Sequence, residues 1–128
     1  MSIQTIRFLI AAALFVHGVG HTLGIWKPAR SLPFLKIREP ALRLVGGILW
    51  VLVALGFVVA SMGFFGLLVP AGWWRPLAVV FALISMGMLL LFGRSWPLFN
   101  FIGASAMNIA VLVALVWLRW PPFDMFAR

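Results

Sequence analysis

Four apolar segments follow one another along the chain, and each is long enough to cross a lipid bilayer. They cover residues 3–26, 40–64, 76–93 and 97–120. A helix rises about 1.5 Å per residue, so about 20 residues cross the roughly 30 Å hydrocarbon core. Short connections separate the segments. The pattern predicts an all-α integral membrane protein with one domain (1–128), in which four transmembrane helices form an antiparallel bundle with short loops.

Proline and tryptophan mark the ends of these segments. Pro40, Pro76 and Pro97 stand at the starts of the last three segments, where the missing backbone N–H costs no helical hydrogen bond. Trp26 ends the first segment and Trp120 ends the last. Tryptophan concentrates at the level of the lipid head groups, so both residues are predicted to lie at membrane surfaces.

The composition agrees with a membrane protein. Of the 128 residues, 65% are hydrophobic and 9% are charged, with ten Lys and Arg against two acidic residues and a net charge of +8. The cations are spread over the helix ends, so we expect them to contact membrane lipids, including anionic head groups, and not nucleic acid. The chain has no cysteine, which excludes disulfides, thiolate metal sites and thiol catalysis.

Orientation follows from the distribution of cations between the two sides. The side that carries the loops between segments one and two and between segments three and four has six of the ten: Lys27, Arg30, Lys36, Arg38, Arg43 and Arg94. Short loops rich in Lys and Arg stay in the cytoplasm. We therefore expect loop 1–2 in the cytoplasm and both termini outside.

The clearest candidate for chemistry is a pair of histidines inside the first segment. His17 and His21 are four residues apart, so they lie on one face of a helix, one turn apart. Ala13, Gly20 and Gly24 are expected on the same face, and Gly20 and Gly24 form the small-xxx-small pattern of closely packed membrane helices. An imidazole is costly in lipid, so both rings are predicted to face the protein interior.

Depth along the helices indicates which polar groups can meet this pair. Residues near the loop 1–2 surface, or at the level of the histidines and below, are the supporting candidates: Arg43, Arg94, Asn100, Ser105 and Asn108. Ser85 lies near the middle of segment three. Gly46 and Gly47 are at a depth similar to His21, so we expect this glycine pair opposite it. The other half of the bundle is predicted to be almost featureless.

Three interpretations of the histidine pair remain open. The first is a binding site for a lipid-like or quinone-like molecule in the loop 1–2 leaflet, as a binder in its own right or as an accessory subunit of a membrane complex. The second is a membrane redox, metal-binding or haem-binding enzyme centred on His17 and His21, although a zinc site needs three or four ligands. The third is helix packing through hydrogen bonds to Ser105, Asn108 or backbone carbonyls. No sequence feature singles out a substrate or a catalytic residue.

The arrangement resembles a known group of proteins. The run from Arg7 to Gly24, with His17-Gly18-Val19-Gly20-His21 near its end, is followed by three more spans. This layout is similar to that of small bacterial DoxX-like four-helix membrane proteins. The resemblance implies an association with membrane redox systems. We expect a multi-pass protein of the bacterial inner membrane, with a membrane protein complex or a homo-oligomer as partner.

Overall fold

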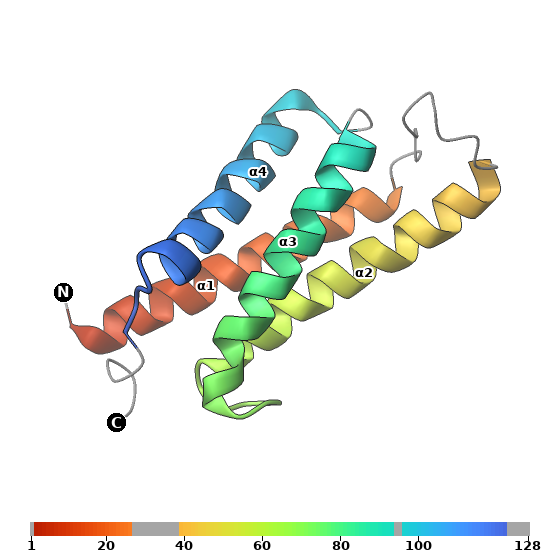
Figure 1. The fold of residues 1–128 in the computed structure, drawn as a ribbon. Helices are drawn as coiled ribbons and strands as arrows, with labels where there is room; N and C mark the ends of the chain where they lie inside the picture. Colours follow the sequence, from red (N-terminus) through yellow and green to blue (C-terminus); the bar gives the residue numbers. More distant parts are fainter. Residues whose placement is uncertain (1, 27–38, 94–95, 123–128) are drawn as a thin grey trace.

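A computed structural model describes residues 2–26, 39–93 and 96–122 and confirms the predicted fold class. It contains four α-helices: α1 (Ile3–His21), α2 (Glu39–Gly63), α3 (Trp74–Phe92) and α4 (Leu98–Leu112). The four are long and apolar enough to cross a membrane once their flanking turns are included. They run in alternating directions, so Ile3 lies at the same end of the bundle as the turn between α2 and α3 (Figure 1).

Two of the helices change their geometry before the predicted end of the segment. After His21, α1 tightens into a 3₁₀-helix, Thr22–Trp26, as is common in a last turn whose carbonyls lack helical partners. The Thr22 hydroxyl donates to the Val19 carbonyl oxygen at 2.7 Å. After Leu112, α4 continues as a π-helix, Val113–Trp117. Both segments therefore cross the membrane as predicted, but not as uninterrupted α-helices.

The helices pack in chain order, with α1 against α2, α2 against α3 and α3 against α4. The tightest approach of α1 to α2 is at Gly18, where a Cβ atom would lie 2.9 Å from both the Ala54 carbonyl oxygen and the Phe57 Cβ. The predicted contact through Gly20 and Gly24 is therefore wrong in part. Gly24 does pack closely, against the Trp50 ring, but an added Cβ at Gly20 has nothing within 4 Å.

Two apolar clusters fill the bundle, one above the other. The larger lies toward the turn between α2 and α3 and includes Phe57, Phe64 and Trp74. The smaller lies toward loop 1–2 and includes Trp50 and Phe92. On α3, Ala82 belongs to the first cluster and Met88 to the second. Ser85 lies between them with none of its surface exposed. A polar side chain is therefore buried where the two apolar clusters meet.

The half of the bundle away from loop 1–2 is not featureless, contrary to the expectation. Arg7 donates from Nε to the Phe64 carbonyl oxygen at 2.9 Å and also contacts that oxygen through Nη2. Arg75 donates to the Leu115 carbonyl oxygen at 2.7 Å. The Ser61 hydroxyl donates to the Ala11 carbonyl oxygen at 2.8 Å. These side chains bind carbonyls of neighbouring helices. Their role is to join the helices of this half.

Candidate functional site

Four polar side chains from three helices form a closed hydrogen-bonded ring between the two apolar clusters. His17 Nε2 lies 2.8 Å from Asn108 Oδ1, and Asn108 Nδ2 donates to Ser85 Oγ at 2.7 Å. Ser85 Oγ lies 3.0 Å from His21 Nε2, and the two Nε2 atoms of His17 and His21 are 3.3 Å apart. The ring therefore connects α1, α3 and α4 at the depth where the clusters meet.

One arrangement of protons satisfies three of the four contacts in this ring and leaves no proton for the contact between the two Nε2 atoms. Asn108 Oδ1 only accepts, so His17 must carry its proton on Nε2 and donate. Ser85 accepts from Asn108 and can donate its own proton to His21 Nε2. His21 then carries its proton on Nδ1, and this nitrogen is buried without a partner among the described residues. Both imidazoles are neutral in this arrangement, in keeping with a place inside the membrane.

Aromatic side chains of α2 hold His21 in place. Its ring lies almost parallel to the Trp50 ring, with centroids 5.4 Å apart, and to the Phe57 ring, with centroids 5.8 Å apart. His21 is 1% exposed. The expectation that Gly46 and Gly47 lie opposite His21 stays a prediction: Gly46 is buried one turn before Trp50 on α2, and the ring that faces His21 is that of Trp50. An added Cβ at Gly47 has nothing within 4 Å.

Beside the ring, a cavity of about 420 Å³ opens between α1 and α4 toward loop 1–2. We call it the polar cavity, and its lining residues are Val16, His17, Gly20, His21, Leu23, Trp96, Phe99, Asn100, Gly103 and Ala104. Gly20 and Gly103 belong to opposite walls, and a Cβ added to either has nothing within 4 Å. The Asn100 amide makes no hydrogen bond within the described residues. The polar cavity thus has room for a ligand, and an amide without a hydrogen-bond partner among the described residues to orient it.

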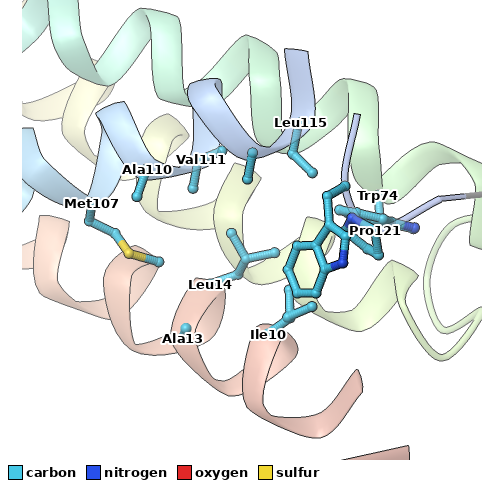
Figure 2. A pocket seen from close by; sticks show the side chains of 11 residues that line it. Ile10, Ala13, Leu14, Trp74, Met107, Ala110, Val111, Leu115 and Pro121 are labelled. Carbon is cyan, nitrogen blue, oxygen red and sulfur yellow. The ribbon is translucent and has the colours of Figure 1, made fainter. Parts of the chain in front are cut away.

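A second cavity of about 160 Å³ lies between the same two helices, further from loop 1–2. In Figure 2, Ile10, Ala13 and Leu14 line it from α1, and Met107 and Ala110 line it from α4. Tryptophans and a proline close its far end: Trp74, Trp120 and Pro121. All its lining residues are apolar, so we call it the apolar cavity.

The structure brings together some of the predicted site residues and leaves others apart. His17, His21 and Asn108 share the hydrogen-bonded ring, and Asn100 lines the polar cavity. Ser105 is half-buried and is not bonded to either histidine within the described residues. Arg43 is exposed and does not line the polar cavity. Arg94 lies outside the described residues.

Two contributors to the site were not identified as such from the sequence. Ser85 completes the ring. Trp96, between α3 and α4, lines the polar cavity and lies 6.2 Å from His21 between ring centroids. A small polar residue at mid-span in α3 was the available signal for Ser85. No local signal pointed to Trp96, because its place depends on the turn between α3 and α4.

The donor chemistry of the histidine pair can also be compared with that of a metal site. Among the described residues, no group of three or more His, Cys, Asp or Glu side chains comes together. The two Nε2 atoms nevertheless converge, and the nearest further donors are Ser85 Oγ and Asn108 Oδ1. The set offers two strong ligands and two weak ones.

Comparison with known proteins adds no relative to this picture. No family model, no curated protein and no solved structure matches the chain. The resemblance to DoxX-like proteins therefore rests only on the residues of α1 and on the four-span layout. The chain is a small four-span membrane protein with a polar ring and two cavities between α1 and α4.

Proposed function

We propose that this protein binds an uncharged lipid-like or quinone-like molecule in the leaflet nearest loop 1–2, with its head group in the polar cavity. The observation that carries the proposal is the polar cavity itself, with a glycine on each of two opposite walls and the Asn100 amide, which has no hydrogen-bond partner among the described residues. Its volume of about 420 Å³ falls in the range of roughly 300–1,000 Å³ that is usual for small-molecule sites. An accessory subunit that holds such a molecule for a partner complex would use the same site.

The lining residues indicate the chemistry of the head group. Within the described residues, the polar groups of the cavity are His17, His21 and Asn100, and none carries a formal charge in the proton arrangement above. A charged head group would meet no counter-charge among these residues, and an unpaired charge inside a membrane is costly. The Asn100 amide can donate to a carbonyl oxygen and accept from a hydroxyl. Carbonyl and hydroxyl groups on an uncharged head are therefore the expected ligands.

Filling the polar cavity should weaken binding without unfolding the protein. We expect Gly103→Leu to weaken binding of a decyl-substituted benzoquinone at least about tenfold, equivalent to about 1.4 kcal/mol, because the new side chain occupies the space of the head group. Asn100→Leu should weaken it as well by removing the amide. Saturable quenching of tryptophan fluorescence in detergent measures the affinity, since Trp96 lines the cavity.

Gly87→Leu on α3 is the matched control for this experiment. A Cβ at Gly87 also has nothing within 4 Å, but Gly87 does not line either cavity. The affinity of Gly87→Leu for the decyl-substituted benzoquinone should equal that of the original protein. The thermal unfolding midpoints of Gly103→Leu, Asn100→Leu and Gly87→Leu should be similar. Equal affinity in Gly103→Leu and Gly87→Leu, or quenching that never saturates, would contradict the proposal.

A metal ion held by His17 and His21 is the second candidate, favoured by one distance. Two nitrogens bound to one tetrahedral zinc ion at about 2.0–2.1 Å lie about 3.3–3.4 Å apart, and the two Nε2 atoms are 3.3 Å apart. Metal-binding histidines usually donate their other N–H to an acceptor. His21 Nδ1 lacks one among the described residues, which is why we rank the metal ion second.

Metal analysis after incubation with zinc or copper and removal of the excess separates the two candidates. If the pair binds metal, the original chain should retain one ion per chain, and His17→Ala and His21→Ala should retain none. Asn100→Leu should still bind the metal although it loses the amphiphile. Metal content below one ion per ten chains in the original protein, or equal content in the histidine variants, would remove this candidate.

A further inference from the structure

The polar and apolar cavities lie in one line along the facing surfaces of α1 and α4, which we call the seam. On α1, Ala13 lines the apolar cavity and His17, one turn later, lines the polar cavity. On α4, Gly103 lines the polar cavity and Met107, one turn later, lines the apolar cavity. The two cavities are therefore separated by no more than about one helical turn on either wall.

The seam is also where the bundle is least tightly joined. The backbones of α1 and α4 approach each other far less closely than those of α1 and α2 or of α3 and α4. The His17–Asn108 bond joins the same two helices, and Met107 lines the apolar cavity from α4 and reaches toward α1 (Figure 2). A methionine side chain has three rotatable bonds and adapts to its surroundings, so it can move aside for a hydrocarbon chain.

The dimensions suit one narrow chain. The apolar cavity measures about 160 Å³, close to the roughly 150 Å³ of an engineered apolar cavity that takes a benzene molecule. From Leu23 to Ile10 the seam extends for roughly 20 Å by helical rise. The polar cavity lies near the loop 1–2 surface and the apolar cavity continues past the middle of the α1 span. A molecule along the seam would thus be oriented as an amphiphile is in a leaflet.

We infer that the ligand is a single-chain amphiphile that lies along the seam, with its uncharged head in the polar cavity and its hydrocarbon chain in the apolar cavity. This inference rests on the proposed function and adds the class of the ligand: one long chain on a carbonyl- or hydroxyl-bearing head. The volume of the apolar cavity, about 160 Å³, has room for one hydrocarbon chain and not for the two acyl chains of a diacyl lipid. Prenylated quinones and monoacylglycerols share this chemistry.

Photo-cross-linking in phosphatidylcholine nanodiscs locates the two ends of the ligand. Two monoacylglycerol probes are compared, one with a diazirine beside the ester and one with a diazirine at the end of the chain. The first should label residues 16–23 and 96–104, and the second residues 10–14 and 107–121. An excess of decyl-substituted benzoquinone should suppress both labels if quinones and glycerides share the site. Suppression by monoolein alone would assign the site to glycerides.

The second measurement compares ligands with and without a hydrocarbon tail. Ala110→Phe narrows the apolar cavity, so it should weaken binding of the decyl-substituted benzoquinone about tenfold. Binding of the benzoquinone without the decyl tail should be unchanged. Ala13→Phe, on the opposite wall, should do the same. Ala106→Phe is the matched control on α4, because Ala106 is exposed and lines neither cavity. Its affinities for both compounds should equal those of the original chain.

The outcomes separate the two proposals. If the benzoquinone without a tail binds in the polar cavity but the probe with its diazirine at the chain end labels the outer faces of α2 and α3, the inference is overturned and the proposed function stands. The conclusion is the same if Ala110→Phe weakens binding of both benzoquinones equally. If neither compound binds saturably and no label is suppressed, both proposals fail. Cross-links between two copies of the chain through the seam would show a protein occupant and would also overturn the inference.

Discussion

Gly18→Ala is expected to lower the free energy of unfolding in detergent by about 1–3 kcal/mol, the usual cost of forcing an extra methyl group into a packed interface. The new Cβ would lie 2.9 Å from the Ala54 carbonyl oxygen and 2.9 Å from the Phe57 Cβ. Two of its three nearest atoms belong to the α2 backbone, which cannot move aside as the end of a side chain can. The helices α1 and α2 must therefore separate. Thermal unfolding followed by circular dichroism measures the effect.

Gly20→Ala is the matched control on the same helix. Its Cβ has nothing within 4 Å, and alanine favours a helix over glycine by up to about 1 kcal/mol. We expect its stability to be unchanged or slightly higher. Equal losses in Gly18→Ala and Gly20→Ala would show that α1 does not face α2 through Gly18.

Asn108→Leu should destabilise the protein by about 1–3 kcal/mol, because it leaves buried polar partners without hydrogen bonds. The substitution removes the acceptor of His17 and the donor to Ser85 while keeping a similar volume. The two lost bonds join α4 to α1 and to α3, and hydrogen bonds between membrane helices average only about 0.6 kcal/mol each. Most of the expected loss therefore comes from the unsatisfied partners. Chemical unfolding in mixed micelles provides the measurement.

Ser105→Ala is the control for that substitution, since Ser105 is on the same helix but bonds neither histidine within the described residues. It should leave stability unchanged. In a double-mutant cycle, Asn108→Leu and Ser85→Ala should cost less together than the sum of the two single changes, because each already breaks the same bond. Strict additivity would mean that the ring of hydrogen bonds does not form.

The four-helix architecture could be predicted from local properties of the chain. Long apolar runs need no tertiary information to indicate membrane spans, and Pro40, Pro76 and Pro97 limit where helices begin. The spacing of His17 and His21 places them on one face of α1 in any helix. Asn108 could also be placed at their depth, because depth depends only on the number of residues from the end of the span. These properties follow from distance along one helix.

Which side each helix turns toward its neighbours was decided only by the tertiary structure. Apart from single polar residues such as His17, His21 and Asn108, the segments are apolar on all sides. The histidines indicate which face of α1 points inward, but the choice between Gly18 and Gly20 as the contact with α2 could not be made from α1 alone. That the Trp50 ring stacks on His21 could not be predicted from α2 alone for the same reason. The hydrogen bonds of Ser85 in the ring and the seam between α1 and α4 depend on how α1, α3 and α4 are each rotated about their own axes. The sequence determined how deep each polar residue lies in the membrane. Packing between the helices determined which neighbouring helix each side chain faces.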